Sequence, residues 1–209
     1  MSPRVTENYT NEKIQGILDA AKMVFIRKGF FDTTMQDIVN ECDISRGGLY
    51  RYFSSTEEIF TNLLEVEAHH NENSFNHLID MDTDAYDILK TFIEGEGENI
   101  LNIKQSLIPA AYEFFIKKKR DGKTMELLEK RHDIAVNVLN KVIQYGIHKD
   151  QVSKDVDPDT ISNCIVTFIE GLIITAIATN IDENDLRKQI STFNSMLWIF
   201  LQARKPQAT

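Results

Sequence analysis

The spacing of apolar residues predicts helices along almost the whole chain. Apolar positions recur three and four residues apart, whereas the strict alternation of a half-buried strand is missing. Glycine and proline are scarce, with nine and four among 209 residues. The pattern therefore predicts an all-α protein with two short helices near residues 34–53. The longer helices are expected over residues 11–28, 55–80, 85–101, 103–119, 123–148, 159–180 and 185–203.

Residues 33–42 have the pattern of a short helix with one apolar face. Thr33 or Thr34 can cap its N-terminus, and Thr34 with Asp37 has nearly the spacing of a capping box. Asp43 follows where a left-handed residue would end the helix, and Asp tolerates that conformation better than most residues. The apolar face repeats at i, i+3, i+4 and i+7. It consists of Met35, Ile38, Val39 and Cys42.

A second short helix is expected after a turn of a few residues. Ser45 can cap it, and Leu49 and Phe53 lie four positions apart on its inner face. Two such helices form a helix-turn-helix, whose second helix enters the major groove of DNA. A small helical hairpin without DNA binding has the same periodicity, so the pattern alone leaves both interpretations open. Basic and aromatic side chains occupy the other faces, namely Arg46, Tyr50, Arg51 and Tyr52.

Residues 29–59 resemble the DNA-binding region of TetR-type (tetracycline-repressor-like) transcriptional regulators. The resemblance implies a three-helix DNA-binding head over residues 1–53. It also implies a larger helical body for effector binding and dimerisation over residues 54–209, although that part resembles the family in length and helical pattern only. The matching elements are Gly29-Phe30, Thr33-Thr34, Asp37-Ile38-Val39, Ile44-Ser45-Arg46-Gly47, Leu49-Tyr50-Arg51-Tyr52-Phe53 and Glu57-Glu58-Ile59.

The resemblance implies roles for single residues of the head. Gln36 and Arg46 would reach base edges, because Gln pairs readily with adenine and Arg with guanine. Thr34 and Tyr52 would hold phosphates, which fix the register without reading sequence. The full set of expected DNA contacts is Thr34, Gln36, Ser45, Arg46, Gly47, Gly48, Tyr50, Arg51, Tyr52 and Thr56.

Three residues of the head depart from the family pattern. Asp43 stands in place of a common turn glycine. Gly48 stands where a Thr or Ser usually contacts phosphate, and Thr56 replaces a frequent Lys. We expect DNA binding to survive these losses, with a shallower dependence on salt because one phosphate charge contact is missing.

The net charge of −9 is unevenly distributed along the chain. Residues 1–53 hold seven basic and seven acidic side chains, so the excess of acidic residues lies entirely in residues 54–209. An acidic body would be kept away from DNA phosphates. A neutral head is weakly basic for a DNA-binding domain, so its affinity is expected to depend on dimerisation and a few placed contacts.

The last two helices carry broad apolar stripes. In the resembled family these helices pair with their copies in a four-helix dimer interface, and a two-fold dimer suits an operator with two half-sites. The alternative is burial within one subunit, and the stripes are wide enough to serve both purposes. The expected interface residues are Ile165, Phe168, Ile169, Leu172, Ile173, Ile177, Phe193, Leu197 and Phe200.

The resemblance places a small-molecule pocket between the connecting helix and the middle helices of the body. Pro109 inside a helical pattern is expected to kink the helix beside such a cavity. An apolar and aromatic lining would suit a small apolar or amphipathic effector. Glu113 or Glu170 would favour a cation if directed inward, but glutamates more commonly face outward and form salt bridges. Aromatic residues at helical spacing nevertheless belong to an ordinary core more often than to a pocket lining. The candidate lining is Phe60, Leu64, Phe92, Leu107, Ile108, Tyr112, Phe115 and Phe168.

The remaining features favour a cytoplasmic protein with no cofactor. Cys42 and Cys164 have no paired spacing and are interpreted as small buried hydrophobes in a reducing compartment. No signal peptide is apparent. The most apolar stretch, residues 165–178, is too short to span a membrane and is expected to be a buried or interface helix.

Catalytic and metal-binding constellations are not apparent in the sequence. His69 and His70 are adjacent, so they face different sides of a helix and cannot chelate one ion together. We therefore expect a sequence-specific DNA-binding regulator and no enzyme. The resemblance implies a homodimeric repressor released from a palindromic operator by a small molecule. A helical adaptor or an unfamiliar helical enzyme without DNA binding is the alternative.

Overall fold

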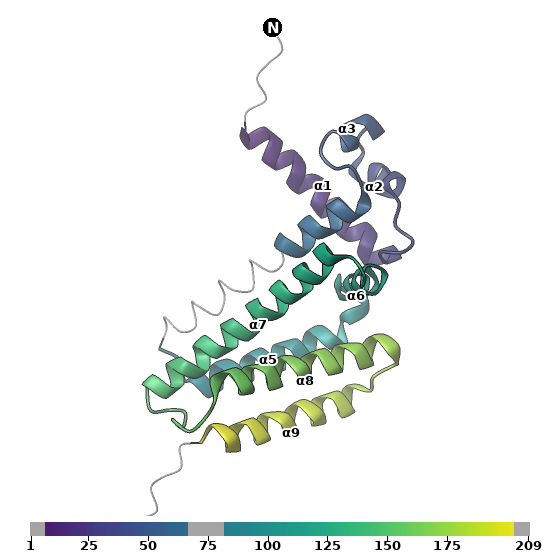
Figure 1. Cartoon of the computed structure of the whole chain (residues 1–209). Helices are drawn as coiled ribbons and strands as arrows, with labels where there is room; N and C mark the ends of the chain where they lie inside the picture. Colours follow the sequence, from purple (N-terminus) through teal and green to yellow (C-terminus); the bar gives the residue numbers. More distant parts are fainter. Residues whose placement is uncertain (1–6, 67–81, 203–209) are drawn as a thin grey trace, which may run out of the picture. The chain divides into compact units, whose positions relative to one another are not determined.

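The computed structural model describes residues 7–66 and 82–202, and every regular element in these two ranges is a helix (Figure 1). The expectation of an all-α fold is therefore confirmed. The long helix expected over residues 55–80 begins at residue 56 and is described as far as residue 66. The rest of the expected range, with His69 and His70, lies outside the described residues.

By its internal contacts the chain divides into two compact units. The head unit consists of residues 1–67 and 104–121, and the body unit consists of residues 68–103 and 122–209. The segment 104–121 thus belongs to the head unit, although the chain on either side of it belongs to the body unit. The expected division after residue 53 concerns function and stays a prediction.

The head unit contains α1 (Glu7–Lys28), α2 (Met35–Cys42), α3 (Arg46–Tyr50), the helix beginning at residue 56, and α6 (Ile108–Lys117). Four phenylalanine rings form its centre. The Phe25 and Phe60 ring centroids are 4.7 Å apart, and those of Phe30 and Phe114 are 4.9 Å apart, both edge to face. Aromatic pairs favour this geometry, and all four rings are almost fully buried, so the cluster joins α6 to α1 and to the helix from residue 56.

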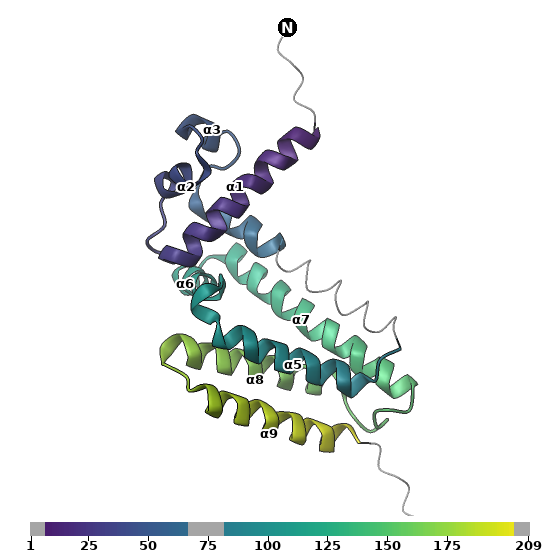
Figure 2. The ribbon, with the colours of Figure 1, turned by 180° about the vertical axis from the view of Figure 1, so that it is seen from behind.

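The body unit contains α5 (Ala85–Leu101), α7 (Gly122–His148), α8 (Pro158–Ala178) and α9 (Glu183–Leu201), which run alongside one another (Figures 1 and 2). Asp84, Asp157 and Asp182 cap α5, α8 and α9 by accepting from free backbone N–H groups. The interior is aliphatic and includes the fully buried Leu89, Ile93, Ile143, Ile165 and Leu186.

The expected helix over residues 103–119 is wrong in its first part. A short 3-10 helix, η1 (Ile103–Gln105), comes first, and α6 begins only at Ile108. Pro109 therefore lies in the first turn of α6 and does not kink a helix, contrary to expectation. The first turn tolerates proline because its N–H groups have no intrahelical partner.

Helix α8 is longer than its most apolar stretch suggested. It begins at Pro158 and has 21 residues, with a mean hydropathy of 1.9 over its most apolar 18-residue window, so length does not exclude a membrane span. Within the described ranges it is the one helix that meets this criterion. Core helices of soluble proteins meet it too, and Ile165, Ile169 and Leu172 are buried inside the body unit.

The two cysteines differ in burial. Cys164 is exposed, so its expected burial is wrong, and Cys42 is half-buried. Both are free thiols. Burial, reinforced by the charge of Glu41, raises the pKa of the Cys42 thiol above its usual value. A raised pKa leaves less of the thiol in the reactive thiolate form.

Candidate nucleic-acid interface

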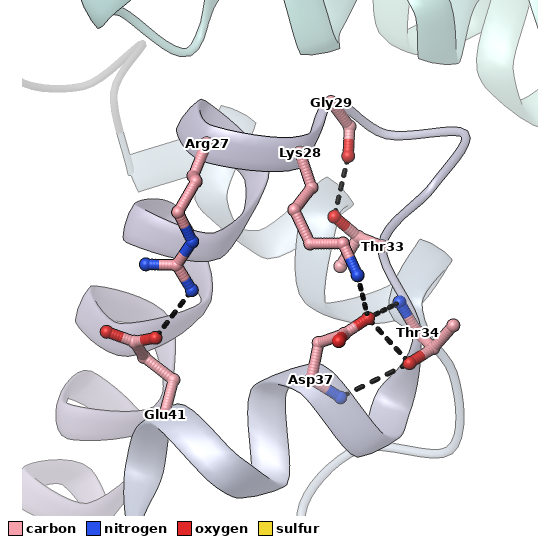
Figure 3. Close-up of polar contacts among 7 residues, drawn as sticks. All are labelled: Arg27, Lys28, Gly29, Thr33, Thr34, Asp37 and Glu41. Carbon is pink, nitrogen blue, oxygen red and sulfur yellow. Dashed lines mark hydrogen bonds and ion pairs between the residues drawn. The ribbon is translucent and has the colours of Figure 1, made fainter.

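The turn between α1 and α2 starts at Gly29. This residue has φ of 76°, a left-handed conformation that glycine adopts without steric cost. Its N–H donates to the Phe25 carbonyl at 2.8 Å, which closes α1. Its own carbonyl accepts from the Thr33 hydroxyl at 2.6 Å, so Thr33 fastens the end of the turn to its beginning (Figure 3).

Helix α2 begins with the expected capping box. The Thr34 hydroxyl accepts from the Asp37 N–H at 3.2 Å, and the Asp37 carboxylate accepts from the Thr34 N–H at 2.9 Å (Figure 3). Lys28 lies 2.8 Å from the same carboxylate. The hydrogen bond from Lys28, followed by those from Thr34, lowers the pKa of Asp37 to about 2. Asp37 thus joins the end of α1 to the start of α2.

A second ion pair crosses between the same two helices. Arg27 Nη2 lies 2.7 Å from Glu41 Oε2, one helical turn beyond Asp37 (Figure 3). Partly exposed pairs of this kind each contribute only about 0–1 kcal/mol to stability. Two of them nevertheless join α2 to α1, and Ile38 of α2 is fully buried in the head unit.

The turn between α2 and α3 has the geometry that its residues predicted. Asp43 adopts φ of 50°, which confirms that a left-handed residue ends α2. The Ser45 hydroxyl accepts from the Gly48 N–H at 3.1 Å and so caps α3. Leu49 is fully buried and anchors α3 to the head unit.

The outer side of α3 carries basic and aromatic groups together. The Arg46 guanidinium lies 5.5 Å from the centre of the Tyr50 ring, and that of Arg51 lies 6.0 Å from the Tyr52 ring. Tyr50 is 43% exposed, and both arginines are exposed. A guanidinium stacked on an aromatic ring loses less conformational freedom when it later meets an acceptor. Such a surface can donate several hydrogen bonds to an anionic partner.

All ten expected DNA contacts lie in the head unit, and none of them is buried. Gln36 is on the exposed side of α2, where its side-chain amide donates to Asn40 at 2.9 Å. Gly48, Tyr52 and Thr56 are partly buried. The exposed members are Thr34, Gln36, Ser45, Arg46, Gly47, Tyr50 and Arg51.

The sequence did not predict the part that two residues play in this geometry. Lys28 forms an ion pair with Asp37 across the α1–α2 turn, and Glu113 accepts a hydrogen bond from Phe30 within that turn. The pairing of Lys28 with Asp37 crosses a non-helical turn, so helical spacing does not reveal it. Glu113 is 83 residues from its partner Phe30. It is half-buried, and its carboxylate is bound by backbone N–H groups of the turn, which the sequence did not suggest.

The expected ligand-binding residues are divided between the units. Phe92 and Phe168 belong to the body unit, and the other six belong to the head unit. Phe60 is fully buried in the phenylalanine cluster, and Leu64 and Leu107 are also buried. Their assignment to an effector pocket stays a prediction. Glu170 is half-exposed and lies 3.9 Å from His132, so it faces outward.

The expected interface residues of α8 and α9 differ in exposure. Ile165, Ile169, Leu172, Ile173 and Leu197 are buried within one chain, and the rings of Phe168 and Phe193 stack at 3.9 Å. Both helices still expose large apolar side chains, and most of these were not in the expected set. They are Ile174, Ile177, Met196, Trp198, Ile199 and Phe200.

A small-molecule pocket and a metal site are the two other kinds of site to consider among the described residues. A shallow hollow of about 430 Å³ is bounded by Asp84, Tyr86, Asp87 and Trp198, none of which was an expected ligand contact. Among the described residues no group of three or more His, Cys, Asp or Glu side chains could hold a metal ion.

Comparison with known proteins identifies the family. Residues 17–63 match the tetR family of bacterial regulatory proteins, and residues 88–187 match a tetracyclin repressor-like C-terminal domain. The uncharacterized HTH-type transcriptional regulator YfiR of Bacillus subtilis is 30% identical over 203 residues, which cover 97% of this chain and 98% of that protein. The HTH-type transcriptional regulator QacR of Staphylococcus aureus is 24% identical, with 88% and 94% of the two chains covered.

Solved structures show the same fold. A TetR transcription regulator from Haloarcula marismortui superposes with a TM-score of 0.79 at 19% identity, over 92% of this chain and 100% of that one. Salmonella enterica GusR superposes with a TM-score of 0.69 at 19% identity, over 95% and 98% of the two chains. With its helix-turn-helix and its match to YfiR along nearly the whole length of both chains, this protein belongs to the TetR family of bacterial transcriptional regulators.

Proposed function

We propose that the protein is a homodimeric repressor that binds a palindromic DNA operator through α3 and is released from it by a small molecule. The observation that carries this proposal is the outer surface of α3. There Arg46, Tyr50 and Arg51 are exposed beside the anchored Leu49. A short helix held by one buried residue and bearing cations on its other side fits the major groove.

The proposed contacts divide into those that read bases and those that hold the backbone. Arg46 and Gln36 are exposed near the starts of α3 and α2 and have the donors for guanine and adenine edges. Thr34 and Ser45 are at helix N-termini, where free N–H groups attract phosphate oxygens. Both of their hydroxyls also cap their own helices, so phosphate binding would use their remaining hydrogen-bonding capacity. The other proposed contacts are Gly47, Gly48, Tyr50, Arg51, Tyr52 and Thr56.

Dimerisation through α8 and α9 is supported by their exposed apolar side chains. Ile199 is 71% exposed and Phe200 63% exposed, although both are large and apolar. Leaving such groups in water is unfavourable by roughly 1.5–3 kcal/mol for each side chain that a partner could bury. A second copy of the chain would bury the same patch on both sides, as two-fold symmetry requires.

Release by an effector would act through the spacing of the two heads in the dimer. Recognition helices must lie about 34–36 Å apart, or a multiple of that, to enter successive major grooves. A ligand that favours another spacing needs to couple to DNA binding by only ~1–3 kcal/mol to act as a switch. The proposed effector is apolar or amphipathic, because the aromatic and aliphatic residues proposed as its lining carry few polar groups.

The test of DNA binding is selection from a pool of random duplexes by the full-length protein at low salt. The proposal predicts enrichment of one palindromic sequence with two half-sites. A single enriched half-site would contradict the dimer, and the absence of any enriched sequence would contradict sequence-specific binding. In the second case a helical adaptor would be the better account, because it needs no cationic α3.

A further inference from the structure

Helix α6 belongs to the head unit, although its neighbours in the sequence, α5 and α7, belong to the body unit. Its segment, residues 104–121, packs with the head, yet the chain enters it from α5 and leaves it into α7, both in the body unit. The chain thus connects α6 to a body helix at each end. The part that α6 plays in function depends on which other residues of the head unit it contacts.

The central contact is made by Glu113. Its Oε2 accepts from the Phe30 N–H at 2.7 Å and from the Phe31 N–H at 3.1 Å. These two N–H groups follow the end of α1, where the chain has left the helix and offers them no helical partner. Hydrogen bonds from amides to a carboxylate are stronger than neutral ones, so this single side chain holds two successive peptide groups of the turn.

The carboxylate also fits closely against the glycine of that turn. A Cβ added to Gly29 would lie 2.7 Å from Glu113 Oε2, closer than real Cβ contacts allow. Gly29 therefore provides space for Glu113 in addition to its left-handed backbone. A side chain at position 29 would push the carboxylate away from its place beside the Phe30 and Phe31 amides.

Three neighbours of Glu113 contact the same region of the head. The Phe114 ring packs edge to face on Phe30, and the Lys117 ammonium lies 5.1 Å from the Phe30 ring centre. Lys118 forms an ion pair of 2.6 Å with Glu57, near the start of the helix from residue 56. Positions 113, 114, 117 and 118 share one face of a helix, so this face of α6 contacts the rest of the head unit.

The turn held by Glu113 is the one that sets the start of α2. The Thr33 hydroxyl donates to the Gly29 carbonyl, and the next residue, Thr34, caps α2 (Figure 3). Peptide groups 30 and 31 lie between these fixed points. Glu113 of α6 therefore holds the short stretch of chain that leads into the start of α2.

We propose that Glu113 is a positioning residue for DNA binding, through which α6 holds the α1–α2 turn in the arrangement that binds the operator. This inference rests on the proposed function and deepens it, because it names a residue outside the proposed DNA-contacting surface on which operator affinity depends. Glu113 itself does not touch DNA. Loss of its carboxylate lowers operator affinity by releasing the turn, while the exposed face of α3 remains unchanged.

The experiment compares the full-length wild type with Glu113→Gln and Glu113→Ala. Glu126→Gln, at an exposed position of α7, is the matched control. Three quantities are measured: the exchange rates of the Phe30 and Phe31 amide hydrogens, the affinity for the selected duplex, and the thermal midpoint of unfolding. The first quantity requires no DNA, so it judges the contact independently of the proposed function.

Glu113→Ala is expected to speed exchange at the two amides and to weaken operator binding, each by ~10-fold or more, as befits a lost charge-assisted hydrogen bond. Glu113→Gln retains an acceptor oxygen and is expected to fall between wild type and Glu113→Ala. The Gln variant decides the matter if the Ala variant does not fold. Glu126→Gln is expected to match wild type in all three measurements.

Two results would overturn the proposal while leaving the proposed function intact. One is unchanged exchange at both amides, which would mean that the carboxylate does not hold the turn. The other is faster exchange with wild-type operator affinity, which would reduce Glu113 to a local stabiliser. If the wild type itself binds no duplex, the proposed function fails, and the positioning role fails with it.

Discussion

Lys28 Nζ lies 2.8 Å from Asp37 Oδ2 and joins the last turn of α1 to the first turn of α2. The same carboxylate closes the capping box with Thr34. One side chain thus serves as helix cap and interhelical link at once. Because Thr34 and Gln36 are proposed DNA contacts, the ionisation of Asp37 controls the stability of the surface that carries them.

Asp37→Asn is expected to change how stability depends on pH. The pKa of Asp37 is about 2 in the folded chain, below its ordinary value of 3.8, so the carboxylate contributes stability above pH 3.8 and loses it as pH falls through 2. A shift of this size corresponds to at most ~2.5 kcal/mol. Solvent around this partly exposed pair reduces the contribution to about 1 kcal/mol.

Urea unfolding of wild type and Asp37→Asn between pH 2 and 7 measures this contribution. The two free energies of unfolding should differ most near neutrality and converge at the acid end. Asp133→Asn, on the exposed side of α7, serves as control and should follow wild type throughout. A constant difference between Asp37→Asn and wild type at every pH would show that the charge of Asp37 is not what matters.

Gly29→Ala should destabilise the head unit. The left-handed φ of 76° alone costs an alanine roughly 1–2 kcal/mol, and the approach of Glu113 to 2.7 Å adds to it. Gly16→Ala is the matched control, because Gly16 lies inside α1 with open space around it. That change should stabilise the protein by about 1 kcal/mol through helix propensity. Thermal unfolding of both variants checks the opposite signs, and equal signs would contradict this account of Gly29.

Much of the head could be predicted from sequence because its signals are local. Thr34 with Asp37, Asp43 and Ser45 each act on residues only a few positions away, and all three features have the predicted geometry. The expected helix over residues 85–101 also has those limits in the structure. Local spacing failed at Pro109, where a periodic apolar pattern continued across a break between η1 and α6.

What the sequence could not provide depends on contacts between distant residues. Glu113 meets the Phe30 and Phe31 amides across more than 80 positions, and nothing in its own neighbourhood distinguishes it from a solvated glutamate. The prediction that Cys164 is buried was wrong for a similar reason. Cys164 lies on an apolar helix, but on the side that no other described helix covers, and so it is exposed.

Asn194→Leu is expected to stabilise the body unit. Asn194 is only 4% exposed on α9, and neither polar atom of its side chain has a hydrogen-bond partner among the described residues. A buried amide left unpaired costs about 1–3 kcal/mol, and leucine has the same branched arrangement of side-chain heavy atoms without that cost. The free energy of unfolding should therefore rise by ~1–2 kcal/mol. Asn137→Leu makes the same exchange at an exposed position of α7 and is the control for the effect of the exchange itself. A lower stability of Asn194→Leu alone would mean that the amide has an essential partner.

Phe200→Asp should weaken dimerisation. Phe200 is 63% exposed on α9, and a carboxylate in its place would be buried without a partner in the proposed interface. Sedimentation at micromolar concentration should find wild type dimeric and the variant largely monomeric. Met23→Asp changes a comparably exposed residue, 56% accessible, on α1 of the head unit and should stay dimeric. A dimeric Phe200→Asp would place the interface elsewhere.

The most direct test of the central claim is titration of the selected operator, and of a scrambled duplex, with wild type, Arg46→Ala and Arg187→Ala at one fixed salt concentration. Arg187 lies on α9 in the body unit, so its removal changes net charge equally without touching α3. Arg46→Ala should bind the operator ~10–100-fold more weakly and discriminate less against the scrambled duplex, as loss of a base-reading arginine predicts. Arg187→Ala should behave as wild type. Equal operator affinities for Arg46→Ala and wild type would contradict sequence reading by α3.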